Sequence, residues 1–267
     1  MAGPADTRNL AVFCDFENVA LGVREAKYAK FDIARVLERL LLKGSIVVKK
    51  AYCDWERYKE FKATMHAAAF ELIEIPHVRM SGKNSADIRM VVDALDLCYT
   101  KTHVDTFVIV SGDSDFSPLV SKLRENAKTV IGVGVKNSSS DLLVSNCDEF
   151  IFYDDLVREE ETQRRAAKKR RESGASREGA AAPGGDKNQE AMDLVLETLA
   201  ALVAERGAGE KIWGSMVKQA LKRRKPGFNE SYYGFRAFSD LLEEAATRKL
   251  VLLEHDEKSG GYLIRLA

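Results

Sequence analysis

Four aspartates, Asp15, Asp87, Asp113 and Asp115, stand at the ends of apolar segments or at the start of a helical pattern. Carboxylates that are pressed together repel one another, which raises their pKa values unless a cation neutralises them. Their hard oxygen atoms suit Mg²⁺ or Mn²⁺. A metal ion held in this way polarises a phosphate and activates water. The residue types therefore indicate metal-dependent phosphodiester chemistry, provided that the fold brings these side chains together.

The predicted strands explain how they meet. Asp15 ends the first strand, and Asp113 follows the fourth. In a doubly wound sheet these two strands are neighbours, and ligands bind at their carboxyl ends, where the strand order reverses. Asp87 lies in the first turn of a long helix, and the strand that follows this helix returns to the same edge. A plainer alternative stays open, because aspartate after a strand is also a common turn former or helix cap.

The first 155 residues alternate apolar runs with helical patterns, which predicts a parallel α/β sheet flanked by helices. The predicted strands are Leu10–Asp15, Ile46–Asp54, Glu71–Pro76, Thr106–Gly112, Thr129–Val135 and Phe150–Tyr153. The predicted helices between them are Asp32–Leu42, Arg57–Ala69, Asn84–Tyr99, Ser117–Asn126 and Ser138–Cys147.

Three motifs occur in order within about residues 8–155. They are Asp15-x-x-Asn18, Lys83-x-x-x-Asp87-x-x-x-x-x-Asp93-Ala94 and Ser111-Gly112-Asp113-Ser114-Asp115-Phe116. Together they resemble the NYN domain family, in its LabA-like branch, which is related to PIN-domain nucleases. The resemblance implies a PIN-like parallel sheet that binds divalent metal and cuts RNA. It carries metal binding over onto Asp15, Asp87 and Asp113, and further catalytic positions onto Asn18 and Asp115.

Secondary candidates follow from position. Lys83 precedes the helix of Asp87, and Ser138 opens the helix after the fifth strand, where backbone N–H groups attract phosphate. Asp54 ends the second strand at the same edge of the sheet. A capping or surface role explains each of these residues equally well. Asp93 also matches the family pattern, but its six-residue distance from Asp87 places it on another helix face.

The remainder divides into a linker and a second unit, so the predicted domains are 1–157, 158–188 and 189–267. The linker combines a basic cluster with a segment rich in Gly, Ala and Ser that cannot form a core. Residues 189–267 show three helical patterns, Ala191–Glu205, Trp213–Arg224 and Glu230–Lys249, followed by a hairpin. This order is typical of a small winged-helix domain.

Three segments of this second unit resemble the LOTUS family, also called OST-HTH. They are Trp213-Gly214-Ser215-x-Val217-Lys218, Pro226–Leu242 and the closing hairpin with Gly261-Tyr262. The resemblance implies RNA binding, or protein binding in some members. A basic stripe on the second helix fits phosphate contacts, which do not depend on base sequence. It consists of Lys218, Lys222, Arg223, Arg224 and Lys225. Alternatively, the basic residues simply form a solvent-exposed helix face. The spacing of the aromatic residues that follow the stripe fits a buried helix face.

Composition sets further limits. The 41 basic and 41 acidic residues give a formal net charge of zero, so nucleic acid as a partner is neither favoured nor excluded. The four cysteines show no metal-ligand spacing and lie in apolar runs, which predicts reduced, buried thiols. Neither a signal-peptide pattern nor a membrane-spanning apolar run is present. We therefore expect a soluble protein of the cytoplasm, without a membrane partner.

The sequence thus favours a metal-dependent RNA endonuclease with a tethered RNA-binding winged helix. The alternative is a binding adaptor for RNA or protein that retains an idle NYN fold. Asp15-x-Glu17 and Gly112-Asp113 also echo haloacid-dehalogenase phosphatases, but those enzymes have aspartate where Glu17 stands. A nucleotide kinase is disfavoured because the phosphate-binding loop G-x-x-x-x-G-K-[ST] does not occur.

Overall fold

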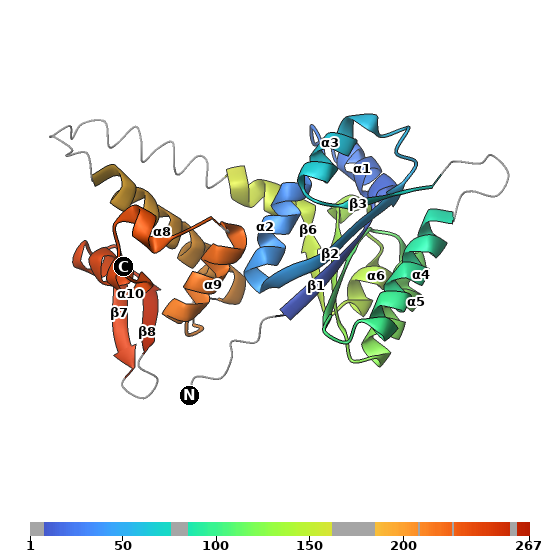
Figure 1. The fold of residues 1–267 in the computed structure, drawn as a ribbon. Coiled ribbons are helices and arrows are strands. Elements are labelled where there is room, and N and C mark those ends of the chain that lie inside the picture. Colours follow the sequence, from blue (N-terminus) through green and yellow to red (C-terminus); the bar gives the residue numbers. More distant parts are fainter. Residues whose placement is uncertain (1–7, 76–84, 162–184, 208, 226, 257–260) are drawn as a thin grey trace. The chain divides into compact units, whose positions relative to one another are not determined.

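The computed structural model describes residues 8–75, 85–161, 185–207, 209–225, 227–256 and 261–267 (Figure 1). The chain forms two compact units. One comprises Arg8–Leu40 with Ser45–Arg170, and the other consists mainly of Arg171–Ala267. None of the described helices is long and apolar enough to cross a membrane. The domain limits given above stay a prediction.

The N-terminal unit is built on a six-stranded sheet with the order β3-β2-β1-β4-β5-β6. Its strands are β1 Arg8–Asp15, β2 Gly44–Cys53, β3 Glu71–Glu74, β4 Thr106–Val110, β5 Thr129–Gly134 and β6 Glu149–Phe152. Strands β1 and β4, β2 and β3, β4 and β5, and β5 and β6 pair in parallel. All six predicted strands are present, and the predicted α/β fold class is confirmed.

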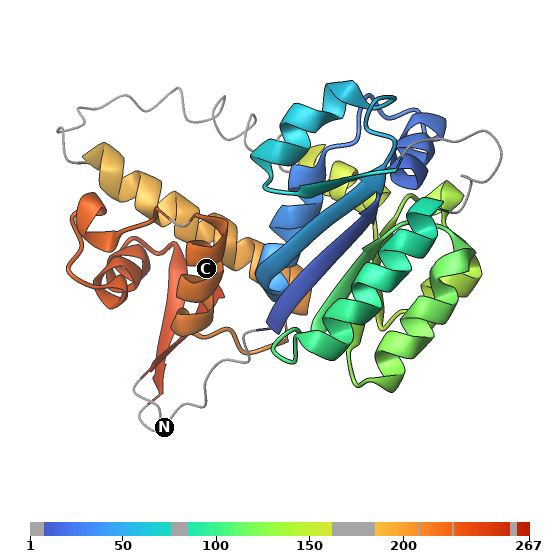
Figure 2. The same ribbon diagram turned by 45° about the vertical axis from the view of Figure 1, so that its right-hand side comes forward.

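Helices cover both faces of this sheet (Figures 1 and 2). Alternate residues of β1 enter two separate cores, with Val12 in one and Phe13 in the other, as the two-residue period of a strand requires. The core of Val12 also contains residues of α1 Phe16–Glu25, α2 Ile33–Lys43, α3 Lys59–Ala67 and the helical residues 153–161. The core of Phe13 contains residues of α4 Ser85–Thr100, α5 Ser117–Glu125 and α6 Asp141–Asn146.

Helix α1 is an element that the sequence analysis did not predict. Phe16, Val19 and Val23 recur at helical spacing and are buried in the core. The helix begins directly after β1, and the carboxylate of Asp15 accepts a hydrogen bond from the backbone N–H of Asn18 as its N-cap. The residues of the first motif are therefore held at a strand-to-helix junction.

The loop after β4 packs closely against the loop after β5. The backbone N–H of Ser140 donates to the carbonyl oxygen of Gly112 at 2.8 Å. A Cβ atom on Gly112 would lie only 2.3 Å from the carbonyl oxygen of Ser138, so no other residue fits without displacing backbone. This contact fixes the position of the segment that carries Asp113.

The C-terminal unit has the predicted order of helices and hairpin. Its elements are α8 Gly185–Arg206, α9 Gly214–Arg224, the 3₁₀ helix η3 Glu230–Tyr233, α10 Phe238–Thr247, β7 Val251–Asp256 and β8 Gly261–Leu266. Strands β7 and β8 pair antiparallel. Residues including Val195, Leu199, Val217 and Leu241 form its core.

The prediction of a single helix over 230–249 is wrong. The backbone of Gly234 is left-handed, with a φ angle of 86°, and it ends η3 before α10 begins at Phe238. Glycine adopts this conformation without a steric penalty, and an αL glycine commonly ends a helix. The periodicity of the apolar residues continues across this break, which is why the sequence pattern concealed it.

The close approach at Gly112 generates a stability prediction. Gly112→Ala should lower the free energy of unfolding by about 1–3 kcal/mol, because the added methyl group overpacks a backbone contact. Urea unfolding measures the change. Gly209→Ala is the control, since nothing lies within 4 Å of a Cβ atom at Gly209. Equal stability of the two variants would contradict the packing described for the β4 loop.

Candidate active site

The carboxyl ends of β1 and β4 lie side by side. Cys14 of β1 pairs with Val110 of β4, so Asp15 at the end of β1 and Asp113 just after β4 lie where the strand order reverses. Asp87 lies in the first turn of α4, whose C-terminal end leads back to β4. The structure thus brings the predicted aspartates to one edge of the sheet.

The electrostatics of these aspartates show that they influence one another. The pKa of Asp15 is raised to about 7, mainly by burial and in addition by the charges of Asp87 and Asp113. The pKa of Asp87 is raised to about 6, first by burial and then by repulsion from Asp113, Asp115 and Glu17. Crowded carboxylates in a site of low exposure have this behaviour. The crowding therefore opposes full ionisation of the group.

Asp15 is the most buried member, with 7% of its surface exposed. The hydroxyl of Ser111 donates to its Oδ2 atom at 2.9 Å, and the backbone N–H of Asn18 donates to Oδ1 at 3.3 Å. The backbone N–H of Asp113 in turn donates to Oγ of Ser111 at 3.2 Å. Both oxygens of Asp15 are oriented by neutral donors, which hold the carboxylate in place without a positive charge.

Asn18 links α1 to the β4 loop. Its side-chain oxygen accepts a hydrogen bond from the backbone N–H of Gly112 at 2.9 Å. Asp113 caps the 3₁₀ helix η1 Ser114–Phe116, because its Oδ1 atom accepts from the N–H of Asp115 at 3.0 Å. Asp113 is half-buried and Asp115 is exposed. Asp15 and Asp113 therefore cap helices and also belong to the acidic group.

The prediction that Ser138 begins the helix after β5 is wrong. It ends a short 3₁₀ helix, η2 Lys136–Ser138, and α6 begins only at Asp141 with Ser140 as its N-cap. A Cβ atom on Gly22 would lie 2.3 Å from the Ser138 hydroxyl, so this side chain packs against α1. The glycine of α1 leaves the space that this contact needs.

Three further polar side chains at the site, those of Ser111, Glu17 and Arg57, were not among the predicted site residues. Ser111 is fully buried and donates to Asp15, while Glu17 adds to the repulsion on Asp87. Oε1 of Glu17 also contacts Nη1 of Arg57 at 3.0 Å, which places a guanidinium group next to the acidic group. The spacing Asp15-x-Glu17 was a visible signal for Glu17. Nothing in the sequence pointed to Arg57.

Other candidates have structural partners. Asp93 accepts hydrogen bonds from the Tyr52 hydroxyl at 2.9 Å and from Arg89 at 3.0 Å, so it ties α4 to β2. Asp54 accepts from the backbone N–H of Glu56 in the turn after β2. Lys83 lies outside the described residues. Among the residues that are described, no group of three or more His, Cys, Asp or Glu side chains is arranged to hold a metal ion.

The basic stripe of α9 is partly engaged in ion pairs. Lys218 contacts Glu230 at 2.8 Å, and Arg224 contacts Glu197 at 2.7 Å. Arg223 is half-buried. The side chains of Lys222 and Lys225 are exposed. These two lysines are therefore the members of the stripe best placed for contact with a polyanion.

The raised pKa of Asp15 predicts a pH-dependent stability. The folded state holds this proton more tightly than the unfolded chain, whose ordinary aspartate pKa is 3.8, against about 7 when folded. Without divalent cations, the stability that protonated Asp15 contributes should therefore be lost as the pH rises from about 4 to about 7, by on the order of 2–4 kcal/mol.

Asp15→Asn cannot titrate and should lack this loss. Urea unfolding with chelator at about pH 5 and about pH 8 measures both proteins. The variant should be more stable than the wild type at the higher pH. If both proteins respond to pH in the same way, Asp15 is not the buried titrating group.

Comparison with known proteins agrees with this geometry. Residues 9–155 match the NYN domain family. An uncharacterized protein of Methanocaldococcus jannaschii is 27% identical over 125 residues, which are 47% of this chain and 49% of that protein. Meiosis regulator and mRNA stability factor 1 of Xenopus tropicalis is 26% identical over 150 residues, which are 56% of this chain and 9% of that protein.

The chain thus spans about half the length of the first relative and about a tenth of the second. A crystal structure of a Vibrio parahaemolyticus protein of unknown function is 27% identical, with a TM-score of 0.51. The match covers 57% of this chain and 97% of that one. Since the family match extends over more than half of the chain and includes the acidic site, the chain belongs to the NYN domain family, whose members are generally RNA nucleases.

Proposed function

We propose that the N-terminal unit is a metal-dependent endoribonuclease and that the C-terminal unit binds RNA. The observation that carries the proposal is the buried Asp15 carboxylate, whose pKa is raised by burial and by two other aspartates. Perturbed carboxylates of this kind mark functional sites, because a structural role alone gains nothing from the repulsion. Membership of the NYN family and a relative named for mRNA stability support RNA as the substrate.

The acidic group suits a divalent cation. Asp15, Asp87 and Asp113 would hold Mg²⁺ or Mn²⁺, with Asp115 in support. Their oxygen atoms are hard ligands, and a positive ion would offset the repulsion that raises the pKa values of Asp15 and Asp87. When bound, such an ion polarises a phosphate and lowers the pKa of a water molecule.

The remaining groups position these ligands and the substrate. Ser111 and the backbone of Asn18 orient Asp15. The side-chain oxygen of Asn18 is engaged by Gly112, so its amide nitrogen is the atom that would donate to a phosphate or water. Arg57 supplies a positive charge beside Glu17 that would attract the RNA backbone. Lys83 stays a proposed phosphate contact in the segment before α4.

We assign residues 189–267 to a LOTUS-like winged helix, joined to the nuclease unit 1–157 by the linker 158–188. The exposed Lys222 and Lys225 would contact RNA phosphates. This unit would supply affinity, because tethering raises the local concentration of RNA at the nuclease. A protein partner is the alternative ligand for this unit.

A specific observation also supports a second function, a non-catalytic adaptor for RNA or protein. Among the described residues, no group of three or more His, Cys, Asp or Glu side chains is arranged to hold a metal ion. An adaptor would retain the fold and the acidic edge without cleavage.

Cleavage assays separate the two functions. The full chain should cut single-stranded RNA with Mn²⁺ or Mg²⁺ and not with EDTA. Asp87→Asn should lower the single-turnover rate at least ~100-fold, because metal ions contribute several kcal/mol to such reactions. Asp96→Asn is the matched control, since Asp96 is an exposed aspartate on the same helix.

Inactivity of the folded wild type with every metal tried would support the adaptor instead. Wild-type rates in Asp87→Asn would remove Asp87 from the metal site. Circular dichroism of each variant verifies that the fold is intact, which we expect because the change removes one of several repelling charges.

The C-terminal unit is tested by salt dependence. The double variant Lys222→Ala/Lys225→Ala should weaken RNA binding and flatten the log–log salt slope by roughly 0.7 for each lost phosphate contact, while the rate at saturating RNA stays nearly unchanged. Lys211→Ala/Arg265→Ala removes two exposed cations outside α9 as the control. Titration of labelled RNA at several salt concentrations measures the slope. Unchanged affinity in the α9 variant would favour a protein partner for this unit.

A further inference from the structure

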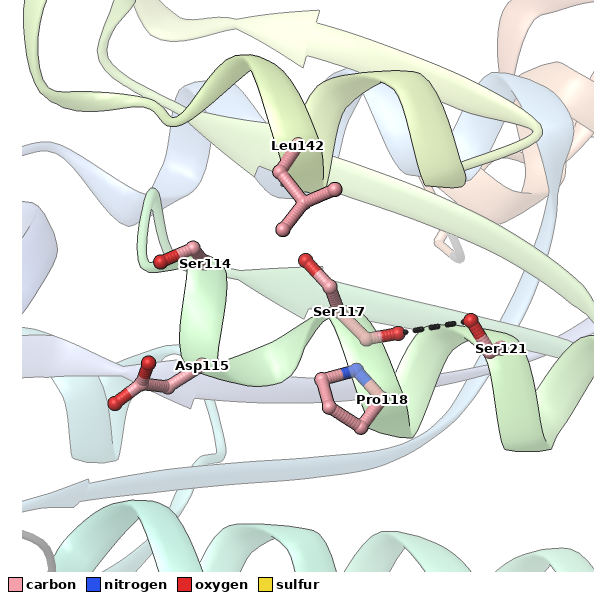
Figure 3. A pocket seen from close by; sticks show the side chains of 6 residues that line it. All are labelled: Ser114, Asp115, Ser117, Pro118, Ser121 and Leu142. Atoms are coloured by element: carbon pink, nitrogen blue, oxygen red, sulfur yellow. Dashed lines mark hydrogen bonds between the residues drawn. The ribbon is translucent and has the colours of Figure 1, made fainter.

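A groove lies next to the acidic site, on the side of α5 and α6. It has a volume of about 630 Å³ and is open to solvent. It is lined by Ser114, Asp115, Ser117, Pro118, Ser121 and Leu142 (Figure 3). Its size falls in the range of ~300–1,000 Å³ that is usual for small-ligand sites. Asp115 belongs both to the groove and to the acidic group, so a ligand here would lie beside the proposed cleavage site.

The groove contains a hydroxyl that lacks a partner. Ser117 has only 6% of its surface exposed, and its Oγ atom is buried without a hydrogen bond to any described group. In Figure 3 this hydroxyl points towards Leu142, across the groove. Buried hydroxyls are normally paired, so one that is left unpaired suggests that a ligand completes it.

The lining also indicates which chemical group fits. Pro118 and Leu142 offer apolar surface, and Leu142 has 56% of its surface exposed. The six lining residues include a carboxylate and no cation, so a phosphate would be repelled. A serine hydroxyl both donates and accepts hydrogen bonds. A flat, uncharged heterocycle with polar edges meets these conditions.

We propose that this groove binds a nucleobase of single-stranded RNA next to the cleaved linkage, in contact with Pro118 and Leu142 and hydrogen-bonded by Ser117. The position of the base relative to cleavage rests on the proposed nuclease function, but base binding itself does not. Leu142 moves aside as the base enters, because an exposed side chain changes rotamer rapidly. In this arrangement the groove binds a base, while the acidic group acts on the neighbouring phosphate.

The test observes the methyl groups of Leu142 by NMR in the full chain, with EDTA present to prevent cleavage. The probes are hexaadenylate, hexacytidylate and a hexamer of the same backbone without bases. At saturating concentration, the two base-containing hexamers should shift the Leu142 signals and the abasic hexamer should not. No shift, an equal shift with the abasic hexamer, or failure of all three to bind would overturn the proposal.

Two serine variants test the hydrogen bond. Ser117→Ala should weaken hexaadenylate binding about 2- to 10-fold, the effect of losing one neutral hydrogen bond, without lowering the unfolding temperature. Ser121→Ala is the matched control, because Ser121 lines the same groove but its hydroxyl already donates to the Ser117 carbonyl at 3.1 Å. Equal affinities of the two variants would remove Ser117 from the base site.

The outcome for the groove is separable from that for the nuclease. If hexamers shift Leu142 but the protein never cleaves RNA, the base site stands and the nuclease function fails. If the protein cleaves RNA and Ser117→Ala changes neither binding nor the Leu142 response, the groove proposal fails and the nuclease function stands.

Discussion

The burial of Asp15 among other carboxylates is the constraint on which the rest of the site depends. This side chain ends β1, caps α1 and accepts a hydrogen bond from Ser111, yet its charge is opposed by Asp87 and Asp113. Neutral donors fix its direction but do not neutralise it. The fold therefore maintains an electrostatically unfavourable arrangement that a bound cation would relieve.

The loops around Asp15 are built to maintain that arrangement. Asn18 accepts from Gly112, which lies against the backbone of Ser138, and the side chain of Ser138 packs on Gly22. Each contact joins segments that are distant in sequence, and two of them require a glycine. The position of Asp113 is thus set by the packing of the loop after β4 against α1 and the loop after β5, in addition to its own strand.

The sequence was sufficient to predict the parallel sheet, because buried strands are nearly continuous in apolar residues and alternate with amphipathic helices. It also predicted that β1 and β4 are neighbours. Helix α1 was missed because it begins inside the first motif without an intervening loop and contains Gly22. The break at Gly234 was missed because apolar periodicity carries no information about a single left-handed residue.

For the site, residue types and strand order were enough to bring Asp15, Asp87 and Asp113 to one edge. Contacts that depend on side-chain reach were not predictable, which is why the hydrogen bond from Ser111 to Asp15 and the position of Arg57 were seen only in the structure. Ser138 likewise packs on α1 because α6 begins three residues later than the pattern indicated.

Proton release on Mn²⁺ binding tests the central claim most directly. Calorimetric titrations of the full chain, in buffers of different ionisation enthalpy at about pH 6, measure how many protons leave as the ion binds. Our account predicts saturable binding with net proton release, tighter binding as the pH rises towards about 8, and a smaller release in Asp15→Asn, in which Asp87 still titrates. Absence of saturable binding, or binding that neither releases protons nor depends on pH, would contradict it.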